Sequence, residues 1–298
     1  MRVLHIDSGR EMRGGQWQAL YLMVGQKTLG WEPVLLAPGA SPLAREAAER
    51  GVDCRMLSLR AVAAESKSAA ITHAHDARSH TMAAIAARGP FVVSRRVAFP
   101  VRAGLLSRWK YRRAARYLAI SAYVARQLTA AGIPEEKVAI VFDGVPVEGR
   151  TGGIGDRLLT PEWNDPRKCG EAGREAARRA QVELHTSSRL KEDLPTARAL
   201  LYLSELEGLG SAALLALSFG VPVIASEVGG LPEIVHHGVT GLLVRHDPAE
   251  IAAAIRMLMD NRELAARLGV QGREMVKGGF TLAHLALRTV HEYKKVLG

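Results

Sequence analysis

The chain has 298 residues, 48% of them hydrophobic, and 40 Lys and Arg against 30 Asp and Glu give it a formal charge of +10. This length suggests two domains that each bury a core, and the cysteines, Cys54 and Cys169, are too few for a disulfide framework or a thiolate metal site. We expect a soluble protein of the reducing cytoplasm without a signal peptide or transmembrane helix, because the longest apolar stretch, Leu209–Ala225, is interrupted by Gly220-Val221-Pro222.

Strand and helix signals alternate along residues 1–146. Apolar residues at helical spacing predict helices after Gly14-Gly15, at 42–50 and at 122–131. Short apolar runs predict strands at 3–7, 34–37, 52–57, 71–75, 91–94, 117–120 and 138–142. Because this alternation builds a parallel sheet with helices on both faces, we expect an N-terminal Rossmann-like domain over residues 1–146.

A second α/β domain is expected over residues 147–280. Residues 147–170 hold five of the 29 glycines together with Pro161 and Pro166, which is typical of a linker and domain entry. Strands are then predicted at 182–186, 199–203, 221–225 and 241–244, and helices near 171–180, 211–219, 231–237, 248–259 and 261–277. Residues 281–298 are expected to form a C-terminal helix with an apolar stripe.

The positive charge lies entirely in the first half of the chain. Between Asp76 and Glu135 there is no acidic residue, whereas the same stretch holds eleven basic ones, among them Arg95 and Arg96. Such a field attracts an anion, so these residues could face an anionic acceptor or an anionic membrane surface, although an ordinary solvated face is also open. Nucleic acid is not expected, because no recognition motif accompanies the charge.

Several catalytic motifs are absent from the sequence. The first loop, Gly9–Gly15, has neither the glycine spacing of dinucleotide folds nor the Lys-Ser/Thr of a P-loop. The pairs His73-x-His75 and His236-His237 have no carboxylate or thiol at ligand spacing, so we predict no metal site.

Two glycine loops in the second half carry the strongest functional signal. Glu207-Gly208-Leu209-Gly210 joins a predicted strand to a predicted helix, whose free N–H groups would form an anion site. Glu207 could accept hydrogen bonds from sugar hydroxyls, or it could be an acidic residue at an ordinary helix entry. Gly229 and Gly230 follow the next strand, and both loops are expected at one crevice at the carboxyl ends of the strands.

The segments Ser204–Ser226, Gly229–Glu233 and Gly238–Val244 resemble the donor half of glycosyltransferase family 4, the retaining group 1 glycosyltransferases with the GT-B fold. The N-terminal half, with the Gly14-Gly15 loop, a long helix and Leu29–Val34, resembles the acceptor domain of that family. The resemblance covers nearly the whole chain. It implies two Rossmann-type parallel-sheet domains that face each other across a cleft, the second one reduced.

The resemblance implies a nucleotide-diphosphate sugar donor, a sugar or lipid-linked acceptor, and no required metal or other cofactor. Residues are carried over one at a time: Glu207 and His75 to the reacting centre, with Glu207 on the donor sugar. Further donor contacts are implied for Gly14, Gly15, Gly208, Leu209, Gly210, Gly229 and Gly230.

Three departures from the family pattern stand out. Leu215 occupies the position of a second carboxylate that holds the ribose hydroxyls, and Leu cannot accept a hydrogen bond. Arg157 is a candidate for the diphosphate-binding Arg, but Trp163 stands at the matching Lys. The stretch between Pro161 and Val182 is short for a strand-helix-strand unit, so one strand and one helix of the second domain are expected to be missing.

These observations favour a cytoplasmic or membrane-peripheral, retaining hexosyltransferase-like enzyme of cell-envelope glycan or glycolipid synthesis. The alternative is a degenerate, non-catalytic homologue that binds an anionic partner or a membrane surface through its basic N-terminal face.

Overall fold

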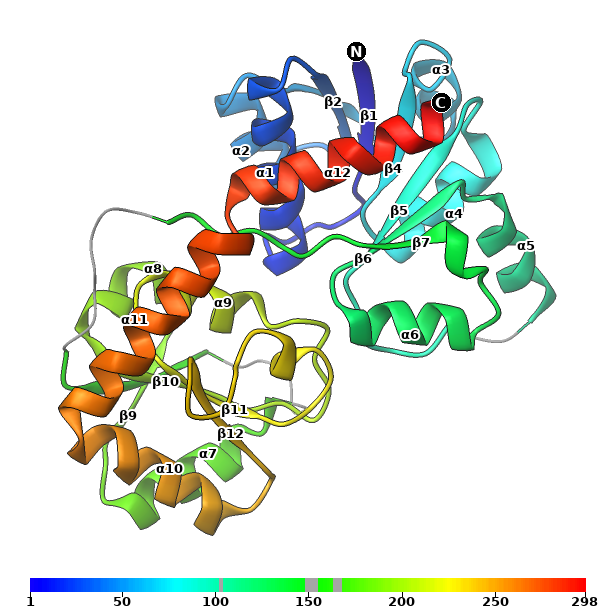
Figure 1. The fold of residues 1–298 in the computed structure, drawn as a ribbon. Coiled ribbons are helices and arrows are strands. Elements are labelled where there is room, and N and C mark those ends of the chain that lie inside the picture. Colours follow the sequence, from blue (N-terminus) through cyan, green and yellow to red (C-terminus); the bar gives the residue numbers. More distant parts are fainter. Residues whose placement is uncertain (102–103, 148–154, 163–167) are drawn as a thin grey trace. The chain divides into compact units, whose positions relative to one another are not determined.

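The computed structural model describes residues 1–101, 104–147, 155–162 and 168–298 (Figure 1). The chain forms two compact units. The first unit comprises Met1–Gly144 together with Leu282–Gly298, and the second comprises Val145–Thr281. The C-terminal helix therefore belongs to the same unit as the N-terminus. Among the described residues, no helix is long and apolar enough to span a membrane.

The first unit is built on a seven-stranded parallel sheet in the order β3-β2-β1-β4-β5-β6-β7. Its strands are β1 Arg2–Ile6, β2 Glu32–Ala37, β3 Asp53–Met56, β4 Ile71–Ala74, β5 Phe91–Arg95, β6 Arg116–Ala119 and β7 Val138–Ile140. Its helices are α1 Gly14–Thr28, α2 Pro42–Glu49, α3 Leu59–Glu65, α4 Ala77–Ala86, α5 Leu105–Arg113, α6 Ala122–Ala130 and α12 Leu282–Leu297. Every strand predicted in this half is present within two residues of its expected ends.

Helix α12 packs beside α1, and the apolar core between these helices and the sheet includes Leu22, Leu285 and Tyr293 (Figure 1). The close approach of the two helices requires Gly25, since a Cβ at this position would lie 2.8 Å from the Cβ of Ala286. The last turns of the chain thereby complete the core of the first unit.

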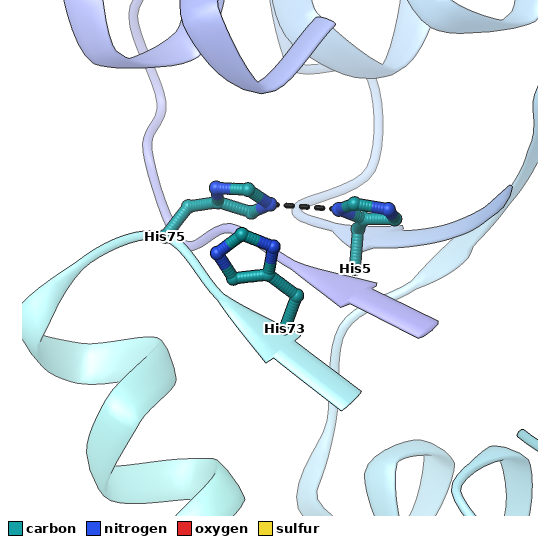
Figure 2. A group of neighbouring side chains, drawn as sticks. All are labelled: His5, His73 and His75. Atoms are coloured by element: carbon teal, nitrogen blue, oxygen red, sulfur yellow. Dashed lines mark hydrogen bonds between the residues drawn. The ribbon is translucent and has the colours of Figure 1, made fainter. Parts of the chain in front are cut away.

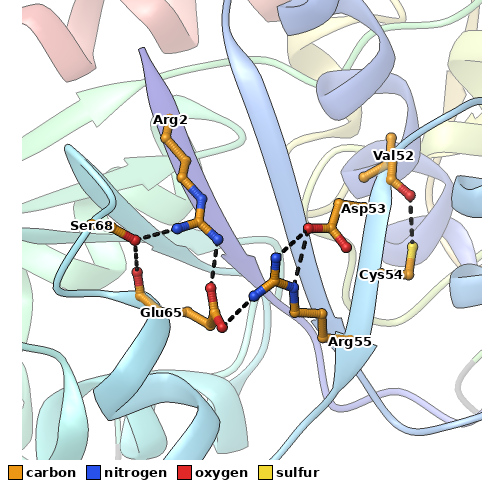
Figure 3. Close-up of polar contacts among 7 residues, drawn as sticks. All are labelled: Arg2, Val52, Asp53, Cys54, Arg55, Glu65 and Ser68. Carbon is orange, nitrogen blue, oxygen red and sulfur yellow. Dashed lines mark hydrogen bonds and ion pairs between the residues drawn. The ribbon is translucent and has the colours of Figure 1, made fainter.

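An ion-pair network ties β1, β3 and α3 together at one end of the sheet (Figure 3). The carboxylate of Glu65 pairs with both Arg2 and Arg55, and Arg55 also pairs with Asp53. Next to this network, the half-buried thiol of Cys54 donates a hydrogen bond to the carbonyl oxygen of Val52 at 3.3 Å and forms no disulfide.

The second unit contains a five-stranded parallel sheet in the order β12-β11-β10-β8-β9. Its strands are β8 Arg157–Pro161, β9 Leu184–Ser187, β10 Ala197–Tyr202, β11 Val223–Ser226 and β12 Gly241–Val244. Its helices are α7 Gly170–Ala180, α8 Leu190–Asp193, α9 Ser211–Ser218, α10 Pro248–Asp260 and α11 Arg262–Gly279.

Two predictions for the second unit are wrong. The stretch 147–170, interpreted as a linker, contains the interior strand β8, whose apolar Leu158 and Leu159 are too short a run to stand out among glycines and prolines. The helix expected at 231–237 is only the 3₁₀ turn Leu231–Glu233. The turn ends where the hydroxyl of Thr240 donates to the carbonyl oxygen of Ile234 and accepts the N–H of His236, and the chain turns again at Gly238, where φ is +74°.

Candidate active site

Each sheet has one point at which the strand order reverses, and ligands of open α/β sheets bind at the carboxyl ends of the strands there. In the first unit this point lies between β1 and β4, which are followed by Asp7 and His75. In the second unit it lies between β8 and β10, which are followed by the segments that carry Lys168 and Glu207. Both predicted reacting-centre residues, His75 and Glu207, thus follow strands at these points, each in its own unit.

The carboxylate of Glu207 is held by three neighbours. Oε2 forms an ion pair with Lys168 and accepts a hydrogen bond from the hydroxyl of Tyr202 at 2.8 Å, and Oε1 accepts the backbone N–H of Gly208 at 3.1 Å. Burial, followed by the nearby Glu207 charge, raises the pKa of Tyr202 well above its ordinary value, so this hydroxyl stays a donor. The carboxylate therefore lies in one orientation.

The Gly229-Gly230 loop lies directly against the backbone of Glu207. The N–H of Gly230 donates to the carbonyl oxygen of Glu207 at 3.1 Å, and a Cβ at Gly229 would lie 1.9 Å from that oxygen. Gly229 also has a φ of +59°, which only glycine adopts freely. The two loops meet, as the sequence predicts, but Gly229 and Gly230 support Glu207 rather than begin a second helix.

The N-terminus of α9 follows at once. Its N-cap, Gly210, has a φ of +100°, and no side chain of a described residue caps the helix. Leu209 is fully buried beneath the turn. Leu215 is half-buried one turn into the helix and offers no acceptor. The free N–H groups of α9 are consequently available to an anion.

Lys168 is the cation that sequence reasoning missed. It lies just before α7, and its Nζ is 3.3 Å from the hydroxyl of Tyr202 and 5.0 Å from the centroid of that ring. Its only signal in the sequence is its position a few residues after β8, which was itself interpreted as linker. Arg157, the predicted diphosphate ligand, begins β8 and lies at the opposite, amino-terminal edge of the sheet, so the structure does not bring it to Glu207. Trp163 lies outside the described residues.

In the first unit, Arg96 connects several predicted residues. Its guanidinium forms an ion pair with the buried Asp143 at 3.2 Å and contacts Nδ1 of His75 at 3.2 Å. A Cβ at Gly15, in the first turn of α1, would lie 3.9 Å from Cδ of Arg96, so the Gly14-Gly15 loop is beside it. Arg95, in contrast, donates to the carbonyl oxygen of Phe99 and is engaged in the local fold.

Three buried histidines gather in the first unit, with His5 on β1, His73 on β4 and His75 directly after β4 (Figure 2). One ring nitrogen each of His5, His73 and His75 lies within 4.8 Å of the others. The sequence indicates His73 and His75 as a pair but not His5, which pairs in register with His73 on the neighbouring strand. Burial lowers the pKa of His5 to about 4 and the pKa values of His73 and His75 well below the ordinary value, and Arg96 adds to each shift.

A pocket of 480 Å³ opens at the carboxyl ends of β1, β2 and β3. Its lining residues include the apolar Met56 and Met82 and the positively charged Arg10 and Arg78. No carboxylate lines it among the described residues. Its electrostatic character therefore suits a ligand with a negative charge.

Solved structures show what fold this is. The crystal structure of Anabaena HepE in complex with UDP and glucose superposes with a TM-score of 0.85 at 14% identity, covering 99% of this chain and 100% of that one. The structure of a glycosyltransferase from Rickettsia africae gives a TM-score of 0.83 at 15% identity, with 99% and 98% covered. The fold is GT-B, with the two parallel-sheet units expected from the sequence.

Family comparisons agree with the fold. Residues 12–148 match the family described as Glycosyltransferase Family 4, and residues 163–275 match Glycosyl transferases group 1. The chain belongs to the family 4 (group 1) glycosyltransferases.

Among curated proteins, alpha-maltose-1-phosphate synthase of Mycolicibacterium smegmatis is 36% identical over 121 residues. The match covers 38% of this chain and 31% of that protein, so it spans about a third of the relative's length. A GDP-mannose-dependent alpha-(1-6)-phosphatidylinositol monomannoside mannosyltransferase of Mycobacterium tuberculosis is 44% identical over 73 residues, which is 24% of this chain and 19% of that protein.

Proposed function

We propose that this protein is a retaining glycosyltransferase, which moves a sugar from a nucleoside-diphosphate sugar to an acceptor. The observation that carries the proposal is the position of the Lys168–Glu207 ion pair, beside the uncapped N-terminus of α9 and at the strand reversal of the second sheet. An anion-binding helix end, a cation and a fixed carboxylate together match the parts of a sugar nucleotide.

Each group has a role in this proposal. The N–H groups that follow Gly210 and the ammonium of Lys168 bind the diphosphate, and Glu207 accepts hydrogen bonds from the donor sugar. Lys168, Tyr202 and Gly208 already use three of the roughly four accepting positions of the carboxylate, which leaves Oε1 for a sugar hydroxyl. When the diphosphate binds, the ammonium of Lys168 can donate to the diphosphate and to the Glu207 carboxylate at the same time.

The proposal assigns no metal or other cofactor to the reaction. In place of a divalent cation, Lys168 and the dipole of α9 would stabilise the negative charge that develops on the leaving diphosphate. The histidine cluster of the first unit is poorly suited to a cation, because the guanidinium of Arg96 lies 3.2 Å from a ring nitrogen of His75.

For the acceptor we propose an anionic sugar or a lipid-linked phosphate, as used in cell-envelope glycan or glycolipid synthesis. Support comes from the pocket in which Arg10 and Arg78 lie with Met56 and Met82. Guanidinium groups recognise phosphate and carboxylate in bidentate geometry, and the methionines would contact the less polar part of the ligand. Arg96, by contrast, would act near His75 and Asp143.

We further propose that α5 brings the enzyme to the anionic inner face of the membrane. No residue of α5 is buried, and Leu105, Leu106 and Trp109 are 85%, 84% and 43% exposed. Basic residues follow on the same helix, namely Lys110, Arg112 and Arg113. Exposed apolar side chains beside cations are typical of helices that lie in a membrane interface.

Transfer is tested by incubating the protein with a panel of UDP- and GDP-sugars and with sugar phosphates or polyprenyl phosphates as acceptors. Mass spectrometry and NMR of the product identify the sugar and its anomeric configuration. The proposal predicts a product that keeps the donor's configuration and is lost in Glu207→Ala. An inverted product would refute the retaining mechanism, and the absence of any product across the panel would favour the non-catalytic alternative.

A further inference from the structure

A continuous row of buried polar side chains crosses the first unit from Arg96 to Ser94. Nε2 of His75 lies 2.8 Å from Nδ1 of His5 (Figure 2). Nε2 of His5 lies 2.8 Å from Oε1 of Gln26. The amide Nε2 of Gln26 lies 3.2 Å from the hydroxyl of Tyr293 on α12, which contacts Nδ1 of His73. Nε2 of His73 then lies 2.8 Å from Oγ of Ser94.

Hydrogen bonds along the row can be donated in only one consistent direction, from Arg96 toward Ser94. A guanidinium can only donate, so Nδ1 of His75 accepts from Arg96. A neutral imidazole carries one N–H, and burial keeps these rings neutral; Nε2 of His75 must therefore donate to His5. By the same reasoning His5 donates to Oε1 of Gln26.

Gln26 continues this order of donation to Tyr293 on the C-terminal helix. Its amide N–H donates to Tyr293, the Tyr293 hydroxyl donates to His73, and His73 donates to Ser94. The opposite orientation of the Gln26 amide would reverse the tautomers of His5 and His75 and set an N–H of His75 against the N–H of Arg96. Arg96 therefore excludes that orientation.

We propose that Arg96 sets the direction of this hydrogen-bonded row and thereby fixes His5, His73 and His75 as neutral Nε2–H tautomers. In this arrangement Gln26 and Tyr293 are positioning residues for His75: they hold His5, and His5 holds the ring of His75 with its Nδ1 lone pair toward Arg96. The C-terminal helix thus contributes to the candidate reacting centre of the first unit through one hydroxyl group.

The inference rests on the proposed function only for the role of His75, and its central test requires no turnover. We would label the histidines of the full chain with ¹⁵N and record long-range ¹⁵N–¹H correlations at neutral pH, which distinguish Nδ1–H from Nε2–H rings. The expected spectrum contains three non-titrating rings in the Nε2–H form. Their assignment to His5, His73 and His75 uses single His→Gln variants. An Nδ1–H form or a charged ring at His5 or His75 would overturn the proposal.

Tyr293→Phe tests the positioning role. It removes the hydroxyl on which His73 and Gln26 depend, so the ¹⁵N signals of His73 and His5 are expected to move. Tyr117→Phe is the matched control, because it removes another buried hydroxyl of the same unit, one that donates to the carbonyl oxygen of Tyr111 outside the row. The control is expected to leave all three signals in place. Identical spectra for the wild type and Tyr293→Phe would contradict the role of Tyr293.

The same spectra separate this proposal from a metal centre. Addition of one equivalent of Zn²⁺ is expected to leave the three rings unchanged, because each nitrogen already has a hydrogen-bond partner and Arg96 repels a cation. Loss of the N–H signals on Zn²⁺ addition would replace the row with a histidine metal site. If the spectra are as expected but no sugar is transferred, the proposed function fails and the tautomer assignment stands.

Discussion

The carbonyl oxygen of Glu207 lies directly against Gly229. A Cβ at position 229 would be 1.9 Å from this oxygen, so only glycine fits there. The Gly229-Gly230 loop and the Glu207 loop are consequently in direct backbone contact. This contact explains why two glycine-rich segments more than twenty residues apart in sequence act on the same carboxylate.

Gly229→Ala is expected to displace Glu207 and weaken donor binding by about tenfold or more, because both the contact and the positive φ oppose a side chain. Gly238→Ala is the matched control. Gly238 has a φ of +74°, but a Cβ added there would have nothing within 4 Å, so this variant carries the strain without the contact. Calorimetric titration with the donor should show a loss for the first variant alone; equal losses would contradict the account.

Lys168→Met is expected to weaken binding of the nucleoside diphosphate by roughly 10-fold or more, since a hydrogen bond to a charged group contributes about 1.5–3 kcal/mol. Arg157→Met serves as the comparison, because Arg157 lies at the other edge of the sheet and is exposed. Dissociation constants for UDP and GDP, measured for both variants, show whether Lys168 or Arg157 binds the diphosphate. A loss confined to Arg157→Met would restore the assignment made from the sequence.

Leu215→Glu is expected to tighten donor binding. A carboxylate one turn into α9 would offer the ribose hydroxyls the acceptor that Leu lacks, and the half-buried position limits the cost of desolvating it. Leu215→Gln provides an uncharged acceptor of the same length for comparison. Weaker binding in both variants, measured by calorimetry, would show that the ribose does not lie beside position 215.

The protein is expected to lose stability as the pH falls below about 6.5. Burial lowers the pKa of His5 to about 4 and of His80 to about 3, and holds those of His73 and His75 well below the ordinary value. Between about pH 6.5 and the lowered pKa of each ring, the unfolded chain binds a proton that the folded protein does not. Each histidine therefore lowers the free energy of unfolding by up to about 1.4 kcal/mol per pH unit as the pH falls. Urea unfolding at several pH values measures the slope, and His80→Phe should reduce it; a flat profile would be inconsistent with neutral buried rings.

Binding to anionic vesicles is expected to depend on the apolar side chains of α5. Replacing Leu105 and Leu106 by Ser should lower sedimentation with phosphatidylglycerol-containing vesicles several-fold, and added salt should weaken what remains. Ile85→Ser, at another exposed apolar residue of the first unit, is the control. Equal binding of the wild type to neutral vesicles, or no effect of the double variant, would exclude α5 as the contact.

The sequence predicts the fold well where apolar segments are bounded by clear turn residues. All strands of the first unit follow from short apolar segments between turns, and α12 follows from its apolar stripe. The sequence does not reveal which unit α12 completes, because that depends on the packing of Gly25 against Ala286. The sequence does not reveal β8, because a strand with two large apolar residues cannot be told from a loop rich in glycine and proline.

The candidate site was predictable in part for the same reason. Glu207, Gly208 and Gly210 form a local pattern, and a local pattern can be read from the chain. Lys168 reaches Glu207, and His5 reaches His75, only through the pairing of strands that are distant in sequence. Neither residue has a neighbour in the sequence that would indicate its role.

Calorimetric titration of the intact protein with UDP- and GDP-sugars in the presence of EDTA measures whether Lys168 and α9 bind a donor without a metal ion. We expect at least one donor to bind without a divalent cation and Lys168→Met to weaken this binding by roughly 10-fold or more. Binding that requires a divalent cation, or that is unaffected by Lys168→Met, would contradict this role of Lys168 and α9.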